Sequence, residues 1–276
     1  MVVISAKEDV SSDNATFWNE LCGSQLARQL GVKDDGPESL KKFDDWYMNF
    51  YPYLYDYIPF EKMAGKKVLE IGLGYGTVAQ LLASSGAIYT GLDIAQGPVN
   101  MVNHRLAQAG LEGQAVQGDV LAPNFEENSF DFIVAIGCLH HTGALDEAIK
   151  KVYRLLKPQG QATIMVYSAA SHRQWGGAPV ATFKRLTGDP TRYRSRNEDS
   201  EIMRGAYDVN EQGDSAPYTE FVTKKELEYL ARDFSSCIVH SENVAFAGLL
   251  SRLPRQFVCK VFGEKLGLDL YCILQK

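Results

Sequence analysis

The sequence predicts an α/β protein built on a doubly wound, mainly parallel sheet. Three observations support this prediction: short apolar segments recur along residues 65–167, acidic residues follow several of them, and helical stretches separate them. Parallel strands that are buried on both faces read as nearly continuous apolar runs, and crossover helices connect them. The 276 residues are enough for one large domain, or for a core with additions.

The first expected strand leads straight into a glycine turn. Residues 68–77 read V-L-E-I-G-L-G-Y-G-T, with Glu70 near the strand's end and glycines at Gly72, Gly74 and Gly76. A side chain at these glycines would fill the space that a ligand at the strand's end needs, and such turns often require positive φ. The spacing G-x-G-x-G differs from the dinucleotide fingerprint G-x-G-x-x-G. It therefore indicates a nucleoside ligand without a pyrophosphate.

Further strands are expected downstream, and two of them end in acids. Asp93 closes the second strand and Asp119 follows the third. An acid after the second strand can hold both hydroxyls of a ribose, although a single acid at such a place can equally be a cap or a turn residue. The fourth strand is an apolar run that needs burial on both faces, and His140 and His141 follow it. These strands are expected at residues 87–94, 115–120, 130–137 and 161–167, with a helix at 144–156.

In this order and spacing, the segments resemble the class I S-adenosylmethionine-dependent methyltransferases. The resemblance is clear over residues 65–167 and looser over the last fifty residues. It implies a Rossmann-like doubly wound sheet of seven strands with an antiparallel last strand. A helix at 223–232 and strands at 235–244 and 268–274 would complete that sheet. The matching motifs are E-I-G-L-G-Y-G at 70–76, G-L-D-I at 91–94, Q-G-D-V at 117–120, A-I-G-C-L-H-H at 135–141 and R-L-L-K-P-Q-G at 154–160.

The resemblance implies S-adenosylmethionine as the cofactor and assigns its methionine end. Glu70 and the three glycines would surround the methionine part, and a helix starting near Tyr75 would turn free N–H groups toward it. Ile136 and Gly137 would offer backbone carbonyls to the ammonium group. A hydroxyl from the region before the core, with Tyr47 as the candidate, would reach the methionine carboxylate.

The nucleoside end follows from the same resemblance. Asp93 would hold the ribose hydroxyls, and Ile94 would pack against the adenine. Asp119 would accept a hydrogen bond from the adenine amino group, with Val120 beside it. Taken together with the glycine loop, the two acids favour these roles over ordinary turn positions.

Residues 1–64 precede the core and are expected to form a helical lid. Residues 17–30 read as one amphipathic helix that Gly31 stops, and residues 43–60 hold nine aromatic residues in eighteen positions. Most of these rings are expected to pack the lid onto the core. Tyr51 and Tyr55 are candidates to line the acceptor pocket, where aromatic faces also attract a sulfonium cation.

Residues 168–222 are too long for a simple loop and are expected to form a cap over the acceptor. Between residues 171 and 205 the cap holds seven Lys or Arg residues against four acids. A solvated face is the ordinary explanation of such a run. The functional alternative is a patch for an anionic acceptor, with Arg173 and Arg194 as its contacts. Residues 223–276 would then complete the core.

Methyl transfer from a sulfonium is an in-line displacement, in which the protein aligns the acceptor and excludes water. A base is needed only when the acceptor must lose a proton. His141, with His140 beside it, follows the fourth strand where the acceptor should lie, and histidine suits proton removal near neutral pH. A structural histidine that only shapes the pocket remains the alternative. We expect a small organic acceptor, aromatic or anionic, and favour O-methylation.

Composition restricts the other classes of function. A net charge of −6 disfavours broad nucleic-acid binding, and no apolar run approaches the ~20 residues of a membrane helix. The five cysteines show no close pairing, which fits a reducing cytoplasm, and no metal-binding motif is present. Three alternatives stay open: an RNA or protein methyltransferase, a dinucleotide oxidoreductase and a non-catalytic S-adenosylmethionine-binding protein. The sequence does not indicate an oligomeric state.

Overall fold

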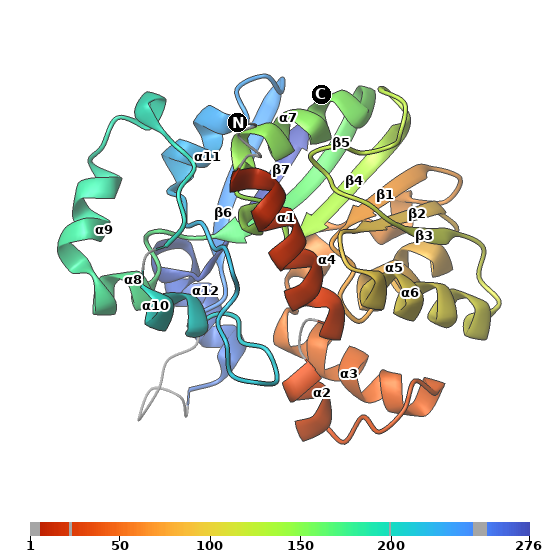
Figure 1. The fold of residues 1–276 in the computed structure, drawn as a ribbon. Helices are drawn as coiled ribbons and strands as arrows, with labels where there is room; N and C mark the ends of the chain where they lie inside the picture. The colour runs from red at the N-terminus through yellow and green to blue at the C-terminus, as the bar shows by residue number, and fades with distance from the viewer. Residues whose placement is uncertain (1–5, 22–23, 199, 245–252) are drawn as a thin grey trace, which may run out of the picture.

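The computed structural model describes residues 6–21, 24–198, 200–244 and 253–276, and a single seven-stranded sheet crosses its centre (Figure 1). The strand order is β3-β2-β1-β4-β5-β7-β6. This confirms the predicted α/β fold with a doubly wound sheet. The strands are β1 (Lys67–Ile71), β2 (Ile88–Asp93), β3 (Gln114–Gln117), β4 (Phe130–Ile136), β5 (Leu156–Tyr167), β6 (Ser236–Glu242) and β7 (Asp269–Gln275).

The pairing of the strands creates a crevice beside β1. Strands β1 to β5 pair in parallel, and β7 lies antiparallel to both β5 and β6, as the resemblance implied. Glu70 of β1 is in register with Gly91 of β2 on one side and with Val134 of β4 on the other. The chain order reverses between these two neighbours, and ligands of open α/β sheets bind outside the strand ends at such a switch point.

Helices cover both faces of the sheet because successive strand residues point to opposite sides. In β4, Ile133 joins a core cluster with α7 (Leu145–Leu155) and α11 (Lys224–Leu230), whereas Val134 joins a cluster with α5 (Thr77–Ser84) and α6 (Gln96–Ala109). Both side chains are fully buried. Burial of apolar area on both faces holds the strand ends in a fixed position.

The region before β1 lies across the carboxyl end of the sheet. It contains α1 (Ala6–Phe17), the 3₁₀ turn η1 (Trp18–Glu20), α2 (Ser24–Gln29), α3 (Pro37–Phe50), α4 (Leu54–Tyr57) and η2 (Phe60–Lys62). Figure 1 shows α1 in red, crossing in front of the ends of the central strands. We call residues 6–64 the lid.

The expectation of one helix over residues 17–30 is wrong. The first helix already ends at Phe17, and the 3₁₀ turn that follows ends where Leu21 adopts a φ of 73°. A left-handed residue cannot continue a right-handed helix. Residues 22 and 23 of the expected helix lie outside the described residues.

The segment that follows β5 forms a second cover, which we call the cap (residues 168–222). It contains α8 (His172–Gly177), α9 (Pro179–Leu186), η4 (Pro190–Arg192) and α10 (Glu201–Gly205), and it lies beside α12 (Arg255–Leu266) in Figure 1. A β-bridge between Ser168 and Val222 closes its base. Thr223 then begins α11 with a capping box, in which its hydroxyl and Glu226 satisfy each other's backbone N–H groups.

Two cysteines that are distant in sequence meet in the sheet. The sulfur atoms of Cys237 on β6 and Cys272 on β7 lie 3.3 Å apart, both as free thiols. Sequence spacing gave no sign of this contact, because it arises from the pairing of β6 with β7.

Candidate functional site

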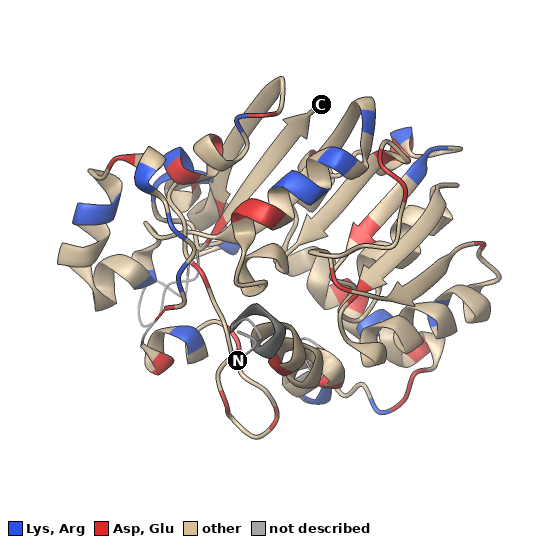
Figure 2. Ribbon diagram, turned by 45° about the horizontal axis from the view of Figure 1, so that its top comes forward, with Lys and Arg blue, Asp and Glu red and all other residues tan. Residues whose placement is uncertain are grey.

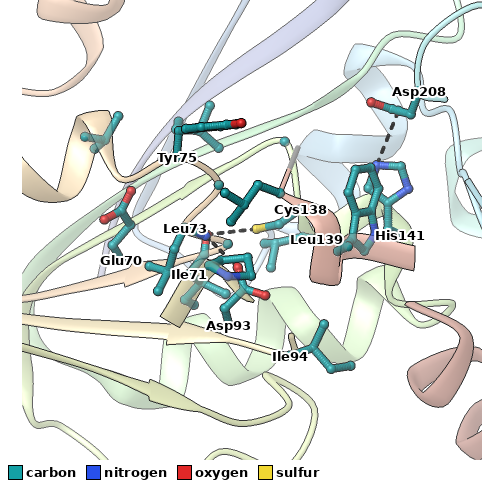
Figure 3. Close-up of a pocket in the computed structure, with 18 of the residues that line it drawn as sticks. Glu70, Ile71, Leu73, Tyr75, Asp93, Ile94, Cys138, Leu139, His141 and Asp208 are labelled. Carbon is teal, nitrogen blue, oxygen red and sulfur yellow. Dashed lines mark hydrogen bonds and ion pairs between the residues drawn. The ribbon is translucent and has the colours of Figure 1, made fainter. Parts of the chain in front are cut away.

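A cavity of about 450 Å³ opens at the carboxyl ends of β1, β2, β3 and β4, where the lid and the cap meet the sheet. Its walls come from the loops after these strands, from α1, η1 and α3 of the lid, and from residues 207–209 of the cap. Figure 3 shows these groups converging from several elements, with Glu70, Asp93 and Asp208 among them. Segments that are far apart in the chain therefore build one site.

The glycine loop between β1 and α5 lines this cavity. Gly72, Gly74 and Gly76 have φ values of +78°, +49° and +78°, which side-chain-bearing residues rarely adopt. A Cβ at Gly74 would stand in open space, with no heavy atom within 4 Å. A Cβ at Gly72 would lie 2.4 Å from that of Cys138, and one at Gly76 would approach Val102 to 3.0 Å. The sequence predicted that all three glycines leave space for a ligand, but only Gly74 does so. Gly72 and Gly76 instead allow neighbouring side chains to pack closely against the loop.

Asp93 is held rigidly at the end of β2. One carboxylate oxygen accepts from the N–H of Leu73, at 2.7 Å, and the other from the N–H of Ala95, at 2.9 Å. The side chain is buried, and burial raises the pKa of Asp93 despite these bonds. Each oxygen keeps a further lone pair, so the carboxylate can still accept from two ligand hydroxyls. Ile94 follows it in the cavity wall.

Asp119 links the core to the lid. Its side chain accepts from the N–H of Leu121 and from the hydroxyl of Ser11 in α1, each at 2.8 Å. Val120 lines the same wall. The lid thus contacts the residue to which the resemblance assigns the adenine amino group.

Glu70 lies at the other end of the cavity and is almost fully buried. The hydroxyl of Tyr89 donates to it at 2.6 Å, yet desolvation dominates and raises the pKa of Glu70 to about 8. Ile136 and Gly137 line the cavity from the end of β4, and Tyr47 and Tyr51 line it from α3 and the residue after it.

His141 lines the cavity, and only one of its two ring nitrogens has a hydrogen-bond partner among the described residues. Nδ1 lies 2.6 Å from the carbonyl oxygen of Tyr218, so Nδ1 carries the proton and donates it. Nε2 is buried and has no hydrogen-bond partner among the described residues. Burial lowers the pKa of His141, so its ring is neutral near pH 7 with a lone pair on Nε2. In the lid, Asn14 donates to the backbone carbonyl of His141 at 2.6 Å.

Two residues that the sequence analysis missed complete this end of the cavity. Asp208 of the cap lies 3.6 Å from Nε2 of His141, and Tyr167, the last residue of β5, donates from its hydroxyl to both oxygens of Asp208, at 3.0 and 3.1 Å. Figure 3 shows Asp208 facing His141 across the site. The place of Tyr167 at a parallel strand's end was a usable signal, whereas no motif marks Asp208.

The structure does not bring His140 to the cavity. Its ring is fully buried, 4.1 Å from the ring of Tyr167 and 4.2 Å from that of His141. It is not among the lining residues. This corrects the expectation that both histidines face the acceptor. The two residues belong to the 3₁₀ turn η3 (Leu139–His141), where successive side chains point in directions about 120° apart.

Three expected acceptor contacts also lie elsewhere. Tyr55 is 55% exposed, with its ring against Phe60, because α4 turns it outward. Arg173 donates to the carbonyl of Ala206 and lies over the ring of Tyr207, and Arg194 is exposed and donates to its neighbour Tyr193. None of the three lines the cavity. Figure 2 shows the basic positions of the cap spread along its ribbon, and no Lys or Arg is among the described residues that line the cavity.

A switch point, a glycine loop and acids at the strand ends are the features that the resemblance to class I S-adenosylmethionine-dependent methyltransferases implied, and the structure contains all three. Residues 69–164 match the family model described as a methyltransferase domain. This match spans about a third of the chain, and it identifies a methyltransferase domain in that segment.

Relatives and solved structures agree with this assignment. A ubiquinone biosynthesis O-methyltransferase of Pseudomonas putida is 33% identical over 101 residues, a match that spans 36% of this chain and 43% of that protein. The chain therefore matches less than half the length of this relative. A SAM-dependent methyltransferase of Methanosarcina mazei has a TM-score of 0.52 at 20% identity, covering 82% of this chain and 97% of that one. A phosphoethanolamine N-methyltransferase of Haemonchus contortus has a TM-score of 0.56 at 18% identity, covering 84% of this chain and 53% of that one.

Proposed function

We propose that this protein transfers a methyl group from S-adenosylmethionine to a hydroxyl of a small organic acceptor, with His141 as the general base. One observation above all supports the proposal: His141 lines the cavity, and its buried Nε2 has no hydrogen-bond partner among the described residues and is in the neutral form that can take a proton. The name of the Pseudomonas relative, an O-methyltransferase, favours oxygen as the methylated atom.

The residues around the cavity fit the proposed cofactor. The open space at Gly74 admits its methionine part beside Glu70, with Tyr47, Ile136 and Gly137 in the surrounding wall. The remaining lone pairs of Asp93 suit two ribose hydroxyls. Asp119 would accept from the adenine amino group, and Ile94 and Val120, which also line the cavity, would pack beside the base. When bound, S-adenosylmethionine supplies an electrophilic methyl group on a sulfonium.

The protein's own groups then perform the remaining work. In this reaction the acceptor oxygen would take the methyl group, the electron pair of the broken carbon–sulfur bond would stay on sulfur, and the hydroxyl proton would go to Nε2 of His141. The bond from Nδ1 to the carbonyl of Tyr218 fixes the tautomer that leaves this lone pair available. The lid and the cap exclude water and hold the acceptor in line.

The covered cavity favours a small acceptor over a macromolecule. Residues of α1, of η1 and of the cap line it opposite the sheet, so a base of RNA or a protein side chain would require these covers to move. In the described part of the chain, no helix is both long and apolar enough to pass through a membrane. A cytoplasmic location and the absence of nucleic-acid partners remain predictions.

The His141→Gln variant tests the proposal. Wild type is expected to bind S-adenosylmethionine in calorimetry and to form S-adenosylhomocysteine with a screened phenolic acceptor. Its turnover should be constant above about pH 7 and fall below the lowered pKa of His141. The variant should bind the cofactor as wild type does but lose on the order of 10²-fold in turnover.

His104→Gln is the matched control, because His104 lies on the outer side of α6 and its side chain is 41% exposed. It should keep the wild-type profile. Full activity of His141→Gln at every pH would remove His141 as the base. Failure of wild type to bind S-adenosylmethionine would contradict the proposed function itself.

A further inference from the structure

The cavity wall contains acidic side chains in place of the basic ones expected from the cap's sequence. The acidic side chains among the described lining residues are Glu20, Glu70, Asp93, Asp119 and Asp208. None of the described lining residues is a Lys or Arg. An anionic acceptor would therefore meet like charge in a poorly solvated site.

Asp208 is the carboxylate that faces the acceptor. Its side chain is only 10% exposed, and it shares the site with Tyr167 and His141. Burial raises the pKa of Asp208, although His141, the hydroxyl of Tyr167 and Arg173 act in the opposite direction. The ionised carboxylate consequently lacks a full counter-charge within the cavity.

Two hydrogen-bond acceptors face each other at this point. Nε2 of His141 carries a lone pair, and an oxygen of Asp208 lies 3.6 Å away, too far for a direct hydrogen bond. Two such acceptors without a proton between them indicate that a ligand supplies the donors. The distance suits donors on the same or on neighbouring atoms of one molecule.

Aromatic rings surround the same point. Trp18 of the lid lies 4.9 Å from the ring of His141, and Tyr207 of the cap lies 4.7 Å from the ring of Tyr167. All four residues line the cavity. Aromatic faces attract cations, and a desolvated site strengthens this attraction. A hydroxyl alone would donate to one of the two acceptors, Nε2 of His141 or the carboxylate of Asp208. A protonated amine would also neutralise the charge of Asp208, and the aromatic faces would attract it.

We propose that the acceptor carries a protonated amino group close to its reacting hydroxyl, with Asp208 as the counter-ion of the amino group and His141 facing the hydroxyl. The role of the hydroxyl rests on the proposed function, whereas the amino-group site rests on Asp208 and the rings alone. The acceptor class is thus a small amino alcohol or aminoalkyl phenol, and not the anion expected from the cap's basic residues.

Calorimetric titration of the protein saturated with S-adenosylhomocysteine tests this binding site directly. The probes are 2-hydroxybenzylamine, 2-hydroxybenzyl alcohol and 2-hydroxybenzoate, which share a phenol and differ in the charge of the neighbouring group. The amine should bind roughly tenfold to a hundredfold more tightly than the alcohol, because a charge-assisted hydrogen bond replaces a neutral one. The benzoate should bind most weakly.

Asp208→Asn should remove the preference for the amine, whereas Glu201→Gln should keep it. Glu201 is an exposed acid of the cap, so its variant makes the same change of charge outside the cavity. Thermal unfolding with S-adenosylhomocysteine checks that each variant is folded. If Asp208→Asn does not fold, the relative affinities of the wild-type protein for the three probes decide the proposal.

Equal or tighter binding of the alcohol or the benzoate, or no binding of any probe, would overturn the amino-group site. The same would follow if folded Asp208→Asn kept the preference. Methyl transfer separates this result from the proposed function. Formation of S-adenosylhomocysteine with the benzoate would support the function and overturn the site, whereas a tightly bound amine that is never methylated would support the site and count against O-methylation.

Discussion

Three carboxyl side chains of the cavity differ in what they can bind, because their neighbouring groups differ. Asp93 receives two backbone N–H groups and retains free lone pairs, Glu70 receives a tyrosine hydroxyl in a dry site, and Asp208 faces an unprotonated histidine nitrogen. A carboxylate that the backbone already holds loses little conformational freedom when a ligand binds. Rigid placement, and not the acid alone, makes Asp93 suited to two ribose hydroxyls.

Replacing Asp93 with alanine should weaken S-adenosylmethionine binding by about tenfold or more, because two hydroxyls lose an ionised partner and Leu73 loses its acceptor. Calorimetry measures the change. Asp45→Ala is the control, since Asp45 is exposed and pairs only with Lys41 on the surface of α3. Unchanged affinity of the Asp93 variant would refute the ribose assignment.

At the scale of elements, the three glycines of the loop between β1 and α5 have two different roles. Some allow close packing of neighbouring segments, and one leaves space for a ligand. Gly72 allows the segment after β4 to approach through Cys138, whose thiol donates to the carbonyl of Ile71 at 3.0 Å. Gly74 leaves open space on the cavity side. A substitution at Gly72 should therefore mainly lower stability, whereas one at Gly74 should mainly weaken ligand binding.

Gly72→Ala should lower the free energy of unfolding by about 2 kcal/mol or more, because its Cβ would collide with Cys138 at a left-handed position. Gly74→Ala should cost only about 1 kcal/mol of backbone strain but weaken cofactor binding. Urea unfolding and calorimetry measure the two effects.

Gly110→Ala is the matched control for strain, because Gly110 has a φ of +63° and no heavy atom within 4 Å of an added Cβ. It lies at the end of α6, outside the cavity lining. It should lose stability as Gly74→Ala does and keep its affinity for S-adenosylmethionine. Equal affinity of Gly74→Ala and wild type would show that the open space is not used by the ligand.

The whole molecule contains several buried carboxyl groups whose pKa values are raised, mainly by desolvation. The pKa of Glu70 is about 8, and those of Glu220 and Asp269 are about 7. Each group contributes stability that is full below its unfolded pKa and is lost as pH rises through its folded pKa. His140 and His141 have lowered pKa values, so their effect on stability is confined to pH values below about 6.5.

The free energy of unfolding should therefore fall between pH 6.5 and pH 8, by up to ~1.4 kcal/mol per pH unit for each proton released. Urea unfolding at three pH values in this window measures the slope. Asp269→Asn should make the fall shallower, since this residue is fully buried beside Asn243 and lies outside the cavity lining. A flat or rising profile for wild type would contradict the prediction.

The local part of the site could be predicted from sequence. Glu70, the glycine loop and Asp93 lie at strand ends, where apolar runs and glycine spacing report the backbone directly, and all of them line the cavity. The lid was predicted less well, because Leu21 breaks the expected helix and no pattern marks a left-handed leucine. Tyr55 has the same spacing as Tyr47 and Tyr51 yet faces outward, since α3 ends at Phe50 and a new helix begins at Leu54.

The sequence by itself determined the positions of the strands along the chain, the glycine turn after β1 and the nucleoside type of the ligand. Each of these depends on residues that are neighbours in the chain. Only the tertiary structure decided the character of the acceptor end. Asp208 meets His141 and Tyr167 because the cap folds back over the ends of β4 and β5. Arg173 and Arg194 of the cap instead donate to backbone carbonyls outside the cavity lining. Contacts between distant segments depend on how whole elements pack, and that packing reversed the charge expected at the acceptor site.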